Sequence, residues 1–278
     1  MIININGRLV QEDQARVHLL DGGLLFGDTL FETIKARGKS ICLQQEHLDR
    51  VELSCGLLGF PCDRSTIEKA LDETAARLPW PVSRLRLTLS RGRGEGLAEP
   101  DRENTWFAIT AAAYSEPTDA ERLHGVACCL APNRRVNPLS LLPQMKRGNY
   151  ADCLYAARHA RKQGYREALF IDTDDRLQEG ATSNLFLVCD GTLVTPPAGE
   201  VVLAGIMRGQ VLMAARHLGM PVQERSVLYQ DLFDAQEVFL TNSLIGLLPV
   251  SSVEGKAVNR GDSWSSLQSQ IQEKECRG

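Results

Sequence analysis

The stretch MKRGNYADCLYAARHARKQGYREALFIDTDDRLQEGATSNLFLV, residues 145–188, decides the fold of the second half of the chain. Residues 149–163 place apolar side chains at helical spacing and stop at a glycine, and residues 168–172 form an apolar run typical of a buried strand. Lys146 stands just ahead of the helix, and Glu179 lies at a turn between two strand-like runs. The pattern predicts a mixed α/β unit that carries one amine and one carboxylate on a strand–turn frame.

The first part of the chain has the pattern of a small α+β unit. It begins with an Asn-Gly turn between two short strand-like runs, within residues 2–10. Two helices and three further strands are expected at residues 46–58, 65–77, 30–34, 83–90 and 106–112. Either Ser65 or Thr66 is expected to cap the second helix. We therefore predict a small α+β domain at residues 1–115, a polar interdomain linker at 116–125 and a larger mixed α/β domain at 126–278.

Composition excludes several classes of protein. The chain has 278 residues, of which 43% are hydrophobic and 24% charged, as in ordinary soluble globular proteins. A net charge of −4 gives no electrostatic reason to expect nucleic acid or an anionic membrane as partner. No stretch approaches the roughly 20 apolar residues of a membrane span, and the eight cysteines show neither a CxxC pair nor a metal-binding spacing. We expect a cytoplasmic protein without a metal site.

Lys146 and Glu179 are the first candidates for chemistry. Lys146 follows the apolar run LSLLPQM, and apolar surroundings disfavour the charged form of an amine and make it nucleophilic. The alternatives are a solvated lysine at a helix N-terminus and an ordinary turn pair at Glu179-Gly180. An amine and a carboxylate on one frame suit a cofactor that binds a lysine covalently and needs a protonated ring nitrogen.

Four further places in the chain could bind an anion. The glycine ahead of Ile206 and Met207 opens a helix, whose free N–H groups could hold a phosphate. Residues 241–243 (TNS) would add side-chain donors, and Arg50 could make a bidentate phosphate contact. The glycine-rich RGRGEG at 91–96 could hold a substrate carboxylate through Arg91 and Arg93, or could be a solvated hairpin tip. The five histidines form no pattern.

The order of these motifs is similar to that of a known family. The motifs are FGDTLFETIKARGKSICLQQEHLDRV, KRGNY, LQEGATSNLFLV with DGTLVTPP, LAGIMR, and EVFLTNSLIGLLPVSSVEGK. This succession, over residues 2–256, resembles the class IV aminotransferases, the pyridoxal-phosphate enzymes of fold type IV. The resemblance implies a two-domain α/β fold, a homodimer, and pyridoxal 5'-phosphate held between the domains, with a small molecule as substrate.

The resemblance also implies roles for single residues. Lys146 matches the lysine that binds the cofactor covalently and moves protons, and Glu179 matches the carboxylate that faces the pyridine nitrogen. Arg50 matches the phosphate-binding arginine. The backbone N–H groups at the phosphate match Ile206 and Met207, the phosphate hydroxyl or its neighbour matches Ser243 beside Asn242, and Tyr150 resembles the tyrosine at the phenolic oxygen of the cofactor.

Three subfamilies fit these motifs: 4-amino-4-deoxychorismate lyases, branched-chain aminotransferases and D-amino-acid aminotransferases. SRGRG, GIMR and the asparagine of TNSLIGLLPV look most like the lyase, which makes 4-aminobenzoate for folate biosynthesis. The KRGNY and EGATSNLF motifs look equally like those of the aminotransferases. A protein of this fold that only binds ligand is a third possibility, which the presence of both Lys146 and Glu179 disfavours. We expect the lyase, with a branched-chain or D-amino-acid aminotransferase as the alternative.

Overall fold

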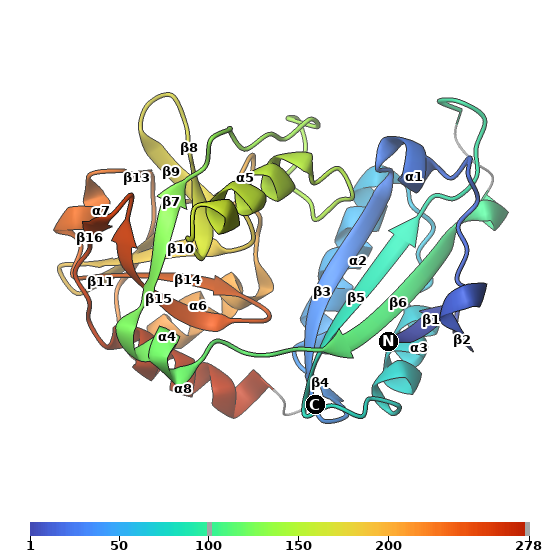
Figure 1. Ribbon diagram of the computed structural model, residues 1–278, viewed down its shortest axis with the longest axis horizontal. Coiled ribbons are helices and arrows are strands. Elements are labelled where there is room, and N and C mark those ends of the chain that lie inside the picture. Colours follow the sequence, from blue (N-terminus) through green and yellow to red (C-terminus); the bar gives the residue numbers. More distant parts are fainter. Residues whose placement is uncertain (99–101, 276–278) are drawn as a thin grey trace. The chain divides into compact units, whose positions relative to one another are not determined.

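The computed structural model describes residues 1–98 and 102–275, and the chain divides into two compact units (Figure 1). Unit 1 comprises residues 1–116, residues 145–150 and Glu275, and unit 2 comprises residues 117–144 and 151–274. Each unit combines helices with a β-sheet, so the expected mixed α/β fold is confirmed. Within the described ranges, no helix is both long and apolar enough to cross a membrane.

Unit 1 is built on a six-stranded sheet in the order β2-β1-β6-β5-β3-β4, and every pair of neighbouring strands is antiparallel. The strands are β1 (Ile2–Ile5), β2 (Arg8–Val10), β3 (Thr29–Arg37), β4 (Ser40–Ile41), β5 (Val82–Ser90) and β6 (Trp106–Ala113). The helices are α1 (Gly22–Phe26), α2 (Gln44–Leu58) and α3 (Arg64–Ala75), with short 3-10 turns at Glu12–Gln14 and Arg102–Asn104. The predicted hairpin at Asn6-Gly7 is confirmed, with φ angles of 49° and 81°.

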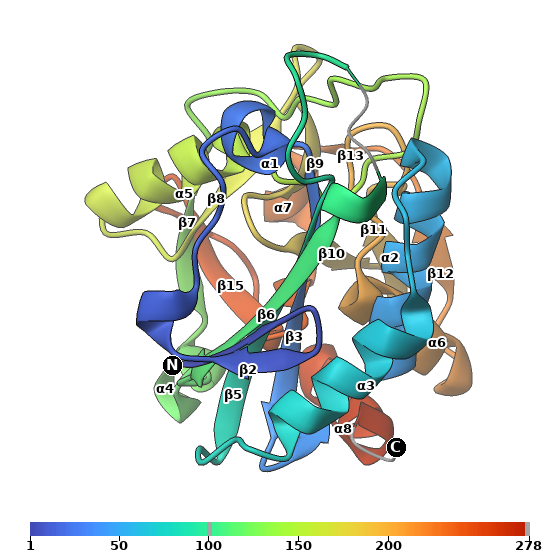
Figure 2. The same cartoon turned by 90° about the vertical axis from the view of Figure 1, so that its right-hand side faces the viewer.

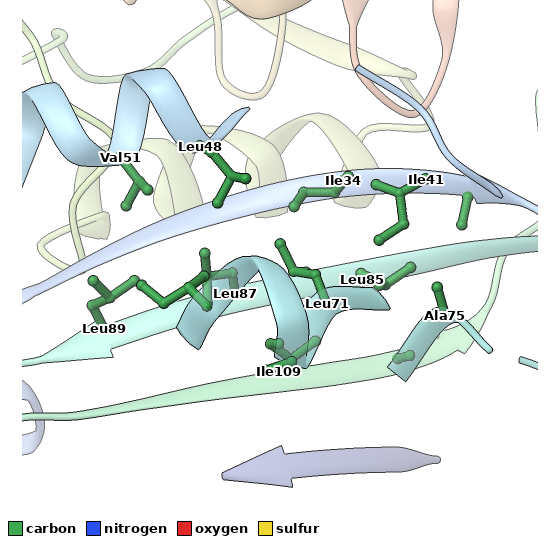
Figure 3. Packing of buried hydrophobic residues seen from close by; sticks show 14 of the residues in the cluster. Ile34, Ile41, Leu48, Val51, Leu71, Ala75, Leu85, Leu87, Leu89 and Ile109 are labelled. Atoms are coloured by element: carbon green, nitrogen blue, oxygen red, sulfur yellow. The ribbon is translucent and has the colours of Figure 1, made fainter. Parts of the chain in front are cut away.

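The core of unit 1 lies between one face of this sheet and helices α2 and α3 (Figure 3). Strand alternation puts Leu85, Leu87 and Leu89 of β5 into this core, while Arg84 and Arg86 point to the other face. Gly59 ends α2 in the left-handed conformation. The cap of α3 was predicted wrongly. Asp63, one turn earlier, accepts the Thr66 N–H at 3.1 Å, because its carboxylate reaches the amide from the true N-cap position.

Residues 145–150 return to unit 1 and pair with the first part of β3. The N–H of Phe31 donates to the Lys146 carbonyl at 2.9 Å, and the N–H of Gly148 donates to the Thr29 carbonyl at 2.8 Å. β4 pairs with β3 only near its other end, at residues 36 and 37. The segment therefore satisfies backbone groups on an edge that would otherwise remain open.

Unit 2 contains a ten-stranded sheet in the order β12-β11-β10-β14-β15-β7-β8-β9-β13, with β16 paired to β15. The strands are β7 (Val126–Leu130), β8 (Glu167–Ile171), β9 (Arg176–Gly180), β10 (Asn184–Cys189), β11 (Thr192–Thr195), β12 (Val222–Glu224), β13 (Val227–Leu228), β14 (Glu237–Asn242), β15 (Gly246–Val253) and β16 (Lys256–Ala257). The helices are α4 (Asp119–His124), α5 (Ala151–Lys162), α6 (Ile206–His217), α7 (Asp231–Asp234) and α8 (Ser263–Glu275). Figure 2 shows the same elements from the side.

Unit 2 contains two β-α-β connections, which can be traced in Figures 1 and 2. Helix α5 connects the parallel strands β7 and β8, and helix α6 connects the parallel strands β11 and β12. The predicted helix at 149–163 and strand at 168–172 correspond to α5 and β8 within two residues. Glu179 was expected at a turn, but it lies within β9, and the turn follows at residues 181–183. The predicted linker at 116–125 contains helix α4.

Candidate active site

Lys146 lies against two aromatic rings of unit 1. Its Nζ is 4.7 Å from the centre of the Phe31 ring and 5.5 Å from the centre of the Tyr150 ring. The two rings meet edge to face with centres 5.4 Å apart. Ring faces attract an ammonium group and fix its position. The structure therefore brings Lys146 and Tyr150, two predicted site residues, together around Phe31.

Two glycines allow the lysine segment to approach the start of β3. A Cβ at Gly148 would come within 2.0 Å of the Thr29 Oγ1, and one at Gly27 would come within 3.1 Å of the Asn149 backbone nitrogen. Gly27 also has a φ of 69°, which disfavours any side chain there. The glycines of the FGD and KRGNY motifs are thus required by the close packing that positions Lys146.

Arg50, the predicted phosphate ligand, belongs to a buried ionic cluster in unit 1. Its Nε and Nη2 donate to the two carboxylate oxygens of Glu32 at 2.8 and 2.5 Å. His47 Nδ1 is 2.7 Å from Glu32 Oε2, and it must donate because an ionised carboxylate only accepts. Burial by itself would raise the pKa of Glu32, but the charge of Arg50 and the bonds from both partners lower it to about 2.

Sequence reasoning missed the two other members of this cluster, Glu32 and His47. Glu32 stands alone in an apolar strand, and His47 had no pattern with the other histidines. The available signal was the spacing of His47 and Arg50, because residues i and i+3 of a helix share a face. Burial lowers the pKa of His47 despite the neighbouring Glu32.

Arg86 is a second residue that the sequence did not single out. It lies on the open face of the sheet, on β5, and its guanidinium carbon is 3.8 Å from the centre of the Phe31 ring. Its Nε donates to Thr88 Oγ1 at 3.2 Å. Phe31 therefore contacts both a guanidinium and the Lys146 amine. The alternating SRLRLTLS pattern indicated which face carries this arginine, but not its neighbours.

Arg91 and Arg93, predicted to bind a substrate carboxylate, differ in their surroundings. Arg91 donates to Asp28 Oδ2 at 2.7 Å and to the carbonyls of Leu58 and Gly59 at 2.9 and 3.3 Å. These bonds satisfy carbonyls at the C-terminus of α2, so Arg91 supports the structure of unit 1. Arg93 forms a backbone bridge with Asp21. Substrate binding by either arginine stays a prediction.

Glu179 lies in unit 2 and is 5% exposed. Its Oε1 accepts from Arg135 Nε at 2.7 Å, and its Oε2 accepts from the Leu203 N–H at 2.9 Å and from Asn184 Nδ2 at 3.5 Å. Arg135 also donates to Asp152 Oδ2 at 2.5 Å. Burial would lower the pKa of Arg135, but the charge of Glu179 raises it above its usual value. The charged Arg135 guanidinium therefore fixes the position of the Glu179 side chain.

The N-terminus of α6, where an anion site is predicted, lies in unit 2. Gly205 is the N-cap residue, and it has no side chain that could bond the first-turn N–H groups, which include those of Ile206 and Met207. A Cβ at Gly205 would come within 2.0 Å of Asn184 Oδ1. Asn184 therefore links the helix start to Glu179, and the glycine is needed for this contact.

Asn242 and Ser243 lie at the turn between β14 and β15. Asn242 Oδ1 accepts from the N–H groups of Leu244 and Ile245, both at 2.9 Å, and its Nδ2 donates to the Thr182 carbonyl at 3.0 Å. The hydrogen bonds of the Asn242 side-chain amide thus stabilise the turn in which Ser243 lies. Of the predicted residues, Lys146, Arg50 and Tyr150 belong to unit 1, and Glu179, Ile206, Met207, Asn242 and Ser243 belong to unit 2.

Comparison with known proteins identifies the class of protein. The family model for amino-transferase class IV matches residues 29–253. The branched-chain-amino-acid aminotransferase of Escherichia coli K12 is 30% identical over 92% of this chain and 86% of its own. The crystal structure of 4-amino-4-deoxychorismate lyase from Pseudomonas aeruginosa is 30% identical, covers 98% of both chains and has a TM-score of 0.88. A bifunctional aminodeoxychorismate lyase and D-amino acid transaminase of Mycobacterium tuberculosis is 27% identical over 94% of this chain and 93% of its own.

The chain therefore belongs to the class IV aminotransferase family, as its motifs predicted. It is an enzyme whose cofactor is pyridoxal 5'-phosphate. The residues present fit this group. Unit 1 offers the Lys146 amine beside aromatic rings, and unit 2 offers a buried carboxylate and an open helix N-terminus.

Proposed function

We propose that the protein is a 4-amino-4-deoxychorismate lyase, which releases pyruvate and forms 4-aminobenzoate. The observation that carries this proposal is the shared contact of the Arg86 guanidinium and the Lys146 amine with the Phe31 ring. A flat, unsaturated ring bearing carboxylates suits an aromatic surface beside a guanidinium. The branched aliphatic side chain of an amino-acid substrate would instead cover the Arg86 guanidinium without forming an ion pair with it. Burying an unpaired charge is unfavourable.

The proposed roles of the residues follow their chemistry. Lys146 holds the cofactor covalently, Glu179 keeps the proton on its ring nitrogen, and Tyr150 contacts its phenolic oxygen. The phosphate is held by Arg50, by the N–H groups of Ile206 and Met207, and by Ser243 in the turn shaped by Asn242. When bound, pyridoxal phosphate supplies an electron sink next to the amino group of the substrate.

Lys146 then moves the protons of the reaction. Its freed amine removes the proton at the ring carbon that bears the amino group. The bond between the ring and the enolpyruvyl oxygen breaks, and a proton from Lys146 reaches the methylene carbon of the departing group, which leaves as pyruvate. Formation of the aromatic ring drives the reaction, so a second amino acceptor is not required.

A purified sample supplied with aminodeoxychorismate and no keto acid tests the proposal. Pyruvate is measured by coupling to lactate dehydrogenase, and 4-aminobenzoate by its fluorescence. We expect equal amounts of both products. Absence of both, together with transfer of the amino group of leucine or D-alanine to 2-oxoglutarate, would support the branched-chain or D-amino-acid aminotransferase instead.

The role of Lys146 has its own test. Lys146→Ala should abolish the visible absorbance of the lysine-bound cofactor and its trapping on the protein by borohydride. Lys69→Ala, which removes an exposed lysine of α3 4.0 Å from Glu73, is the matched control and should keep both signals. If the Lys146 variant still traps the cofactor, another amine binds it. A wild-type protein that never binds the cofactor would favour the non-catalytic alternative.

We also propose that the protein is a cytoplasmic homodimer. Large apolar side chains in residues 17–26 and at Leu97 are exposed, and patches of this kind support protein association. They are Val17, Leu19, Leu20, Leu24, Leu25, Phe26 and Leu97. Sedimentation equilibrium should give twice the chain mass of 30.7 kDa, and a monomer at micromolar concentration would contradict the proposal.

A further inference from the structure

Glu32 occupies a costly position in unit 1. It lies on the core face of β3 between Leu30 and Ile34, where strand alternation places apolar residues, and it is 1% exposed. An ionised carboxylate at such a place is tolerated only when charged and hydrogen-bonding partners surround it. Packing of the core alone therefore does not explain why an ionised carboxylate lies at this position.

The partners of Glu32 come from one face of α2. Arg50 uses its Nε and Nη2 for Glu32, with one bond to each carboxylate oxygen, at 2.8 and 2.5 Å. His47, one turn earlier, donates to Oε2 at 2.7 Å. Two parallel bonds between planar groups fix both the place and the plane of the guanidinium. Since Nε and Nη2 face β3, the orientation of Nη1 is set as well.

The cluster lies near the reactive amine within the same unit. Phe31, the neighbour of Glu32 on β3, donates its N–H to the Lys146 carbonyl at 2.9 Å. Burial lowers the pKa of His47, and the charges of Arg50 and Lys146 lower it further. A second bidentate pair on β3 provides a contrast. Arg37 donates to both oxygens of Glu116 at 2.8 Å, but these side chains are 36% and 23% exposed. The Arg37 pair stabilises an edge of unit 1, whereas the Arg50 pair orients a side chain in its interior.

We infer that Glu32 is a positioning residue, which holds the Arg50 guanidinium in the orientation that binds the cofactor phosphate. The inference rests on the proposed phosphate contact of Arg50. Glu32 does not touch the cofactor in this role, and it acts only through Arg50. His47 supports it by bonding the same carboxylate oxygen that receives Nη2.

Two substitutions separate the position of Arg50 from the charge of Glu32. Glu32→Gln replaces one oxygen by an NH2 group, which would face an N–H donor of Arg50 or His47 and displace the guanidinium. It also removes a negative charge, which by itself favours anion binding. Glu32→Asp keeps the charge and shortens the side chain by one methylene, so only the position of the guanidinium changes.

The experiment titrates the cofactor-free protein with pyridoxal 5'-phosphate and, separately, with pyridoxal, which lacks the phosphate. Binding is followed by absorbance and by protein fluorescence rather than by activity. We expect both Glu32 variants to bind pyridoxal like the wild type, which shows that they are folded. Glu32→Gln should bind pyridoxal phosphate about tenfold more weakly, equal to about 1.4 kcal/mol. Glu116→Gln is the matched control and should leave both affinities unchanged.

Arg50→Ala distinguishes failure of the proposed phosphate contact of Arg50 from failure of the positioning role of Glu32. If this variant keeps the preference for the phosphorylated cofactor, the proposed phosphate role of Arg50 fails, and the inference about Glu32 fails with it. If Arg50→Ala loses the preference while both Glu32 variants keep or increase it, only the positioning role of Glu32 is overturned. If Glu32→Gln does not fold, the outcome for Glu32→Asp decides.

Discussion

Replacing Arg135 by methionine should strongly destabilise unit 2. The Arg135 side chain is 5% exposed and lies between the carboxylates of Glu179 and Asp152, which are 6% and 12% exposed. Methionine retains an apolar stem but leaves both carboxylates buried without their cation. Breaking a buried ion pair from one side costs about 3–5 kcal/mol, a large part of the stability of an ordinary domain.

The pH dependence of this loss is a sharper test than its size. Without Arg135, two buried carboxylates lack their cation, and burial then favours the protonated form of a carboxyl group in the folded variant. A carboxyl group with a raised folded pKa binds its proton first in the folded state, so protonation stabilises the fold as the pH falls. The difference in unfolding free energy between wild type and variant should therefore shrink between about pH 7.5 and about pH 5.5.

Urea unfolding followed by circular dichroism at both pH values measures this difference. Arg166→Met is the matched control, because Arg166 pairs with Glu121 at 3.2 Å and these side chains are 43% and 34% exposed. An exposed pair of this kind contributes less than about 1 kcal/mol. A loss for Arg135→Met as small as that of the control, or one that is the same at both pH values, would refute the reasoning.

Two further predictions use groups already described. Gly205→Ala should lower the unfolding free energy by about 1–3 kcal/mol in a denaturant titration and weaken cofactor binding, because the new Cβ would displace Asn184. Gly209→Ala in the same helix, with nothing within 4 Å of its Cβ, should instead be neutral or stabilising, and similar losses in both variants would contradict this. The folded structure lowers the pKa of Glu32 from 4.5 to about 2. The ionised carboxylate therefore stabilises the fold by up to about 3 kcal/mol above about pH 4.5, and this stabilisation is lost as the pH falls toward 2. Acid titration of stability should therefore be shallower for Glu32→Gln, and parallel curves would exclude this contribution.

The sequence predicted the elements that local pattern controls. Periodicity located α2 and α5, the glycine ahead of Ile206 located the start of α6, and the Asn6-Gly7 pair forms a turn with both φ angles positive. The motif order predicted the family, which the match over residues 29–253 confirms. The helices and the hairpin depend on residues close together in sequence, so the local pattern is enough to predict them, whereas the family was predicted from the resemblance of motifs spread over residues 2–256.

The sequence did not predict contacts between distant residues. Glu32 in LFETI gave no sign that α2 would supply both of its partners, and nothing near Arg135 pointed to Glu179, which lies 44 positions later. Arg91 is a further example. Its glycine-rich surroundings gave no sign that its guanidinium would bond Asp28 and the carbonyls at the end of α2.

The pairing of residues 145–150 with β3 has a consequence for the order of folding. Phe31 and Lys146 are about 115 positions apart, so their backbone bond closes a long loop. Closing such a loop has an entropic cost that local contacts such as the β3–β5 ladder avoid, and long-range contacts of this kind form slowly. A ribosome would also have synthesised all of unit 1's own sheet before this segment emerged. Lys146 thus takes its place late, on a sheet that has already formed.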